Sequence, residues 1–167
     1  DILLNAANSI AVNGATTLGL GTTGGDSSIR TQGGGTTLGN INAFSDVIVQ
    51  ANGAAALDAA VAAGRDVSIT AASVSLATLA NPAGAAIDTL TADGNIVVIS
   101  TASINGGGTQ AFGDVTLQSG DVIDVTSVGG ASVTLSGDAG ITAGQVSSSA
   151  TTSVDSIGGD ILIAGLN

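Results

Sequence analysis

The sequence predicts an all-β fold, a parallel β-solenoid of about eight coils with roughly 20 residues in each coil. The first supporting observation is an internal repeat: A-F-S-D-V-I-V-Q at 43–50 returns as A-F-G-D-V-T-L-Q at 111–118. The second is a period-two alternation of apolar and polar residues, which is typical of β-strands. The third is a 44 % apolar content with two Phe as its only aromatic residues, which indicates a narrow aliphatic core.

The coils in the first part of the chain are less regular than those that follow. Short apolar stretches at 2–4, 10–12 and 18–20 are separated by turn-like segments rich in Asn and Gly. Clearer units begin at Asp46 and Asp66, each with an apolar-x-apolar strand after the Asp. The short Asp carboxylate can accept hydrogen bonds from nearby backbone N–H groups, so we interpret these residues as turn formers.

The spacing between units lengthens twice. The step at 67–96 contains the one Pro of the chain, and an exposed loop is expected at Leu79–Asp88. The step at 133–161 contains a segment rich in Ser and Thr, and a second exposed loop is expected at Ser147–Asp155. The whole chain, 1–167, is expected to form a single solenoid domain, with a segment of a longer array as an open alternative.

The segment 54–63, A-A-A-L-D-A-A-V-A-A, has a high helix propensity. A helix of that length is marginal in water without tertiary support. The segment also lies in phase with the repeat. We therefore expect strand or coil here.

Stacked coils bury an apolar row that one coil cannot bury alone. Each strand is expected to pair in parallel with its equivalent in the next coil, about 4.8 Å away. The first inward position of each unit is expected to form one ladder: Val47, Val67, Ile96, Val115, Val133 and Ile161. The position two residues later is expected to form a second ladder: Val49, Ile69, Leu117, Leu135 and Ile163.

The run G-D-V-T-L-Q-S-G-D-V-I-D-V at 113–125 resembles the repeats of filamentous haemagglutinin-like exoproteins. These are large surface adhesins of Gram-negative bacteria that are secreted by the two-partner pathway. The resemblance extends over most of the chain as a compositional motif. It implies a right-handed parallel β-helix, an extracellular or bacterial cell-surface location, and a place in the repeat shaft rather than in the secretion module.

Charge and composition exclude several classes of function. Thirteen Asp and two Arg residues give a net charge of −11, so nucleic acid is not expected as a partner, because phosphate binding requires Lys and Arg. The chain has no Cys for disulfides or thiolate metal sites. No apolar run reaches the roughly 18 residues of a membrane span. A positively charged leader is also missing, which indicates a removed signal or a longer parent chain.

The two ends of the chain resemble each other, with D-I-L-L at 1–4 and D-I-L-I at 160–163. Neither end has a Lys, a Pro or an amphipathic cap that would block an exposed strand edge. One interpretation is an excised piece of a longer array. The hypothesis we pursue is a head-to-tail filament of identical copies, with these self-assembly residues: Ile2, Leu4, Ile161 and Ile163.

The sequence contains no recognisable catalytic constellation. It has no His and no Lys, and it lacks sugar-binding aromatic residues, so neither an enzyme nor a catalytic or cofactor-binding residue is predicted. Asp121 and Asp124 flank one strand and are the candidate Ca²⁺ ligands, although solvated surface charge is the interpretation we favour. The Asp residues that open the strands have two possible roles. They could form a ladder of calcium ligands, or, as we favour, they could act only as turn formers: Asp1, Asp46, Asp66, Asp114 and Asp160.

The function expected from these features is that of an extracellular structural protein whose solenoids stack head to tail into a filament. The alternative is the shaft of a bacterial surface adhesin. That adhesin would bind host cells or glycans through the exposed loops at Leu79–Asp88 and Ser147–Asp155. A third possibility, a polysaccharide-acting enzyme, predicts a turnover that Asp121→Ala and Asp124→Ala would remove.

Overall fold

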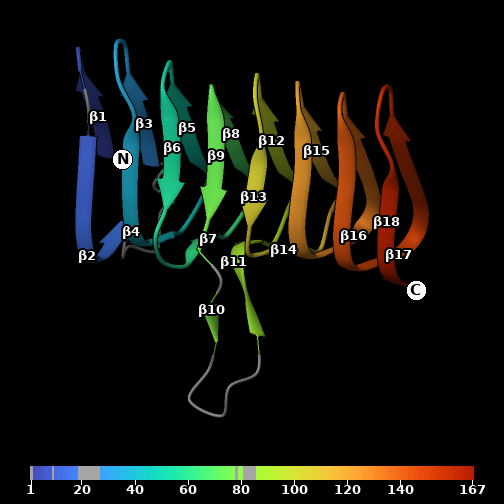
Figure 1. The fold of residues 1–167 in the computed structure, drawn as a ribbon. Helices are drawn as coiled ribbons and strands as arrows, with labels where there is room; N and C mark the ends of the chain where they lie inside the picture. Colours follow the sequence, from blue (N-terminus) through green and yellow to red (C-terminus); the bar gives the residue numbers. More distant parts are fainter. Residues whose placement is uncertain (1, 9, 19–26, 78, 81–85) are drawn as a thin grey trace.

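The computed structural model describes the chain except for residues 1, 9, 19–26, 78 and 81–85. Every helix or strand assigned in the described residues is a β-strand. Figure 1 shows these strands as successive turns of a ribbed rod, with the first turn at one end and the last turn at the other. The predicted all-β parallel β-solenoid is therefore confirmed, with about seven turns.

Each turn contributes strands to three stacks, and within each stack the strands pair in parallel. The first stack consists of separate strands in the first six turns and of the final parts of β16 and β17: β1 (Ile2–Ala6), β3 (Ser27–Thr31), β5 (Val47–Ala51), β8 (Val67–Ala71), β12 (Ile96–Ser100), β15 (Val115–Ser119), β16 (Val122–Gly137) and β17 (Gly140–Ser156).

The second stack consists of the first parts of four long strands, together with three short strands and the first part of β18: β2 (Ile10–Leu18), β4 (Thr36–Ala43), β6 (Ala54–Leu57), β9 (Ser73–Leu76), β13 (Ile104–Gly106), β16, β17 and β18 (Ile161–Leu166). The third stack contains the later parts of β2, β4 and β18 and the middle parts of β16 and β17. It also contains three further strands: β7 (Val61–Ala63), β11 (Ala86–Ala92) and β14 (Gly108–Ala111). The sequence predicted only two strands in each unit, because the strands of the third stack are short and rich in Ala and Gly.

A hairpin projects from the side of the rod. β10 (Leu79–Ala80) pairs with β11 in the antiparallel direction, and Figure 1 shows the pair extending away from the stacked turns. β11 then returns to the third stack, where Leu90 pairs with Val61. The protrusion predicted at Leu79–Asp88 is confirmed by these strands, while residues 81–85 lie outside the described part of the chain.

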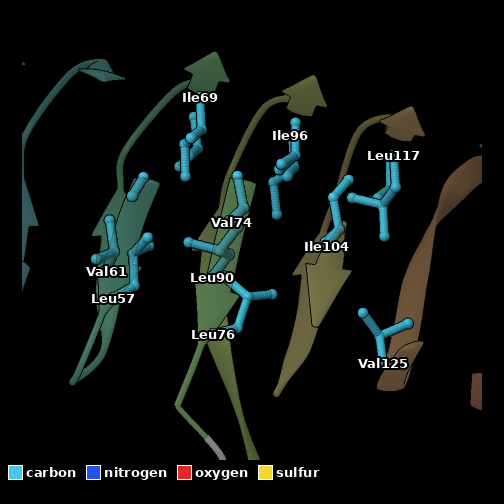
Figure 2. Close-up of a cluster of buried hydrophobic side chains, with 14 of the residues drawn as sticks. Leu57, Val61, Ile69, Val74, Leu76, Leu90, Ile96, Ile104, Leu117 and Val125 are labelled. Atoms are coloured by element: carbon cyan, nitrogen blue, oxygen red, sulfur yellow. The ribbon is translucent and has the colours of Figure 1, made fainter. Parts of the chain in front are cut away.

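Buried aliphatic side chains fill the interior of the rod. Val47, Val67, Ile96, Val115 and Val133 are paired in that order in the first stack and are fully buried, so most of the first predicted ladder is confirmed. Figure 2 shows how side chains from the three stacks meet between the strands, among them Ile69, Val74, Leu90, Ile96, Ile104 and Leu117. The core is a continuous column rather than a central cluster, as expected for a solenoid.

The last rung of both predicted ladders is wrong. Ile161 pairs with Ile141 and Ile163 pairs with Ala143, so both belong to the second stack. Val133 and Leu135 pair instead with Thr152 and Val154.

The reason for this error is the strand β17. It runs from Gly140 to Ser156 without a loop, so the exposed loop predicted at Ser147–Asp155 is wrong. Ser and Thr at its solvent-facing positions give the segment the polarity of a loop, although Thr is also favourable in strands.

The segment 54–63 forms β6 and β7, which confirms strand over helix. Ala55, Leu57 and Val61 are buried in the core, and each pairs with the equivalent residue of the neighbouring turns. Pairing and burial in the stack therefore override the local helix propensity.

Candidate functional site

A column of Asp and Asn side chains connects successive turns from β5 to β16, at the points where their first-stack strands begin. The Oδ1 atom of Asp46 accepts the backbone N–H of Asp66 at 3.2 Å, and Oδ1 of Asp66 accepts the N–H of Asn95 at 2.6 Å. The series continues from Asn95 to Asp114 at 2.8 Å, and from Asp114 to Ser132 at 3.0 Å. These oxygens satisfy backbone donors at a corner, where the regular ladder is interrupted.

The Asp residues of the column differ in one respect from the turn formers that the sequence predicted. Their carboxylates do bind backbone N–H groups, but those groups belong to the next turn rather than to the same turn. Asp160 opens a strand of the second stack and so lies elsewhere, and Asp1 is outside the described residues.

The candidate calcium ligands do not form a cluster in the described structure. Asp121 and Asp124 are both exposed; Asp124 lies in β16 beside Asn105 and Thr142, whereas Asp121 precedes that strand. Within the described ranges, no group of three or more His, Cys, Asp or Glu residues could hold a metal ion.

An ion pair joins Arg65 to the carboxylate at the start of the column. The Nε atom of Arg65 donates to Oδ1 of Asp46 at 2.9 Å, and its Nη2 atom contacts Oδ2 of the same carboxylate. The hydrogen bond from Arg65 lowers the pKa of Asp46 below its ordinary value of 3.8, with a further lowering from the N–H of Asp66, although partial burial acts in the opposite direction. Arg65 adjoins Asp66 in sequence, yet stacking pairs it with the Asp of the preceding turn.

The two Phe residues of the chain stand in one column between the third and first stacks. Backbone hydrogen bonds between turns place four residues at this corner in four successive turns: Phe44, Gly64, Asp93 and Phe112. Three steps of about 4.8 Å separate the two Phe positions by about 14 Å along the rod. Phe44 is 55 % exposed and Phe112 is 81 % exposed.

An open groove of about 810 Å³ is lined by both Phe residues. Gly64 contributes to its shape, because a Cβ atom at this position would overlap the carbonyl oxygen of Phe44. Gly64 and Asp93 occupy the two column positions between the Phe residues. Polar side chains complete the lining: Asn42, Ser45, Arg65, Thr91, Asp93 and Gln110. A second hollow of about 400 Å³ also borders Phe112 and is lined by Gly130, Ser147–Ser149 and Asn167, among others.

The groove brings together two residues that the sequence did not assign to any site. Both Phe side chains are exposed there. The repeat itself indicated that Phe44 would point away from the core. Phe44 follows the buried Ala43 directly, so it is out of phase with the inward positions.

The ends of the rod present strand edges and apolar side chains. Among the described strands, β1 pairs with β3 alone and β18 pairs with β17 alone. Leu4, Val154 and Ile163 are partly buried and pack against the core from the two ends. Leu162 and Leu166 in the last turn are exposed.

Of the predicted self-assembly residues, Leu4, Ile161 and Ile163 do lie in the terminal turns. Leu4 continues the ladder of Ile29 and Val49 in the first stack. Ile161 and Ile163 belong to the second stack, so they are not the counterparts of Ile2 and Leu4. The backbone of Ile2 pairs with Ser27, and its side chain is not among those described.

The backbone N–H groups at the starts of several strands point toward the following turn. The N–H groups of Val47, Val67, Ile96 and Ile141, each the first inward residue of a strand, all donate to a carbonyl of the following turn. By the same pattern, the N–H of Ile161 is directed beyond the last turn. The last turn thus offers donors and acceptors to a further parallel strand.

No protein-family model, curated protein or solved structure matches the chain. The resemblance to filamentous haemagglutinin-like exoproteins therefore stays a prediction. The described part of the chain has no helix with the length and apolarity needed to cross a bilayer.

Proposed function

We propose that the protein is an extracellular structural rod whose copies stack head to tail into a filament. The observation that carries the proposal is that Leu4 and Val154 lie at opposite ends of one inward ladder. A second copy placed on the last turn would bring its Leu4 over Val154, in the register that relates every pair of neighbouring turns within the chain. β1 of the second copy would then pair with the final part of β17.

Backbone and side-chain interactions both favour this contact. The last turn presents the apolar side chains of Ile163 and Leu166, which would be covered by the next copy. The parallel strand edge would gain main-chain hydrogen bonds of the kind already formed between turns. The contact is heterologous and does not close on itself, so it leads to an open filament.

The net charge of −11 opposes this association. Repulsion between copies is screened as the ionic strength rises, so filaments are expected to form more readily at 0.15 M salt and above than at low salt.

Electron microscopy and sedimentation velocity over a range of protein concentrations test the proposal. The expected result is rods of uniform width whose length increases with concentration and with salt. A protein that remains a monomer at high concentration and high salt would contradict it.

A second candidate function is glycan binding by the shaft of a surface adhesin. One of the two loops expected to carry it, Ser147–Asp155, is part of a strand. The groove between Phe44 and Phe112 is a better candidate, because it combines exposed aromatic rings with polar side chains.

A further inference from the structure

We propose that the groove between Phe44 and Phe112 binds a neutral oligosaccharide that lies along the axis of the rod. The proposal rests on the second candidate function, glycan binding, and is independent of end-to-end stacking. It assigns the ligand class and places the site on the side of the rod, at the corner between the third and first stacks.

The aromatic residues give the first argument. The chain has no Trp, Tyr or His, and its two Phe residues both line this one groove. An exposed phenyl ring gains by covering its face with an apolar surface. A pyranose ring offers such a surface, because the C–H bonds on one face form an apolar patch while the hydroxyl groups point outward from the rim.

The dimensions of the groove give the second argument. The two Phe positions are about 14 Å apart along the rod, which exceeds the size of one sugar ring and suits a short chain of linked rings. The groove volume of about 810 Å³ lies within the range of small-ligand sites. Gly64 leaves room between the two rings, since its backbone is too close to Phe44 for any side chain.

The polar lining gives the third argument. Asn42, Ala62, Thr91 and Gln110 occupy one outward row of the third stack over four successive turns. Amide and hydroxyl groups both donate and accept hydrogen bonds, which is what sugar hydroxyl groups require. Three such groups, from Asn42, Thr91 and Gln110, lie beside two apolar rings and match the amphipathic surface of an oligosaccharide.

The charge of the groove favours a neutral ligand. Arg65 forms its ion pair with Asp46, and Asp93 adds a negative charge to the lining. The whole chain carries a net charge of −11. An acidic glycan would be repelled by this field, whereas a neutral glycan would not.

Proton NMR in D₂O provides a direct test, because all aromatic side-chain protons of the protein come from Phe44 and Phe112. The probes are the neutral oligosaccharides cellohexaose, xylohexaose and maltohexaose, each titrated to millimolar concentration. We expect at least one of them to shift the signals of both Phe rings in a saturable manner. Irradiation of the aromatic signals should also transfer saturation to the sugar C–H protons.

Three variants separate this site from other surfaces. Phe112→Ala and Ala62→Ile, the second of which narrows the groove while keeping both Phe residues, should each weaken binding about tenfold or more. Ile157→Ala is the matched control, because Ile157 is 78 % exposed and lies outside the groove lining. The control should bind as tightly as the wild type.

Four results would overturn the proposal. The first is that no neutral oligosaccharide shifts the Phe signals. The second is that an acidic oligogalacturonate binds as tightly as the neutral probes. The third is that Ile157→Ala weakens binding as much as Phe112→Ala. The fourth is that sedimentation shows rods associating side by side through Phe112 with no sugar binding, in which case the groove is a protein contact. None of these depends on end-to-end stacking, so the two ideas fail separately.

Discussion

Leu4 and Val154 lie in the first and last turns of the rod and occupy the same position in the same inward ladder. The first and last turns therefore share one register, as neighbouring turns do throughout the chain. A structure built in this way has no intrinsic length, since each turn is a template for the next. In the proposed filament, Leu4 of one copy would cover Val154 of the next.

A positive charge at position 154 should block stacking. In Val154→Lys, the ammonium group would enter the seam between two copies, where an unpaired charge is costly to bury. We expect the protein concentration needed for filaments to rise at least about tenfold, as measured by sedimentation.

Leu162→Lys is the matched control for that variant. Leu162 lies in the same last turn, but it pairs with Thr142 on an outward row and is exposed. It should assemble like the wild type. Because each added Lys reduces the net charge of −11, repulsion between copies cannot explain a loss of assembly, and equal loss in both variants would contradict the seam assigned to Val154.

Truncation of a core ladder residue should destabilise the rod. Leu117 is fully buried and pairs with Val98 and Leu135 in the neighbouring turns. Leu117→Ala is expected to lower the free energy of unfolding by about 2–5 kcal/mol, as measured by urea denaturation. The neighbouring Gln118 points outward and is exposed, so Gln118→Ala should change it by less than about 0.5 kcal/mol. A comparable loss in both variants would contradict the assigned register.

The Asp and Asn column should respond to loss of an acceptor. Asp66→Ala removes the oxygen that accepts the N–H of Asn95 at 2.6 Å. Because this hydrogen bond is exposed and water can replace the oxygen, its loss is expected to cost about 0.5–1 kcal/mol in unfolding free energy. Asp66→Asn keeps an acceptor oxygen and should lose less than half of this amount. If the two variants are equally unstable, charge rather than hydrogen bonding is the basis of the column.

The ion pair of Arg65 and Asp46 should contribute to stability in a pH-dependent manner. The pKa of Asp46 is lowered in the folded protein, so the contribution is present above the ordinary value of 3.8 and is lost as the pH falls through the lower folded value. Because Arg65 is largely exposed, we expect less than about 1 kcal/mol at pH 7.

Arg65→Met provides the comparison for this effect. The difference in unfolding free energy between wild type and variant should be constant from pH 7 to about 5 and should shrink in more acidic solution. Urea denaturation at a series of pH values measures it. A difference that grows as the pH falls would contradict the assigned pairing.

Much of the fold was predictable because its signals are local. The alternation around Val47 and Val67 marks strands, and their spacing marks one coil. The repeat also indicated that 54–63 would not form a helix. These features depend on residues close in sequence, where propensity and pattern act directly.

The candidate sites were less predictable because they depend on register. The identity of Ile161 does not show whether it lies in the first or second stack, and a long step was read as a loop where β17 continues as strand. The groove between Phe44 and Phe112 likewise depends on which residues of four turns share a corner.

The sequence by itself determined that this chain coils into a narrow aliphatic solenoid, because alternation and period are properties of successive residues. Only the tertiary structure decided that Leu4 corresponds to Val154, that Arg65 pairs with Asp46, and that the two Phe residues line one groove. The physical reason is that neighbours in a solenoid are set by the pairing of one turn with the next. A change of turn length by even one residue would bring different side chains together.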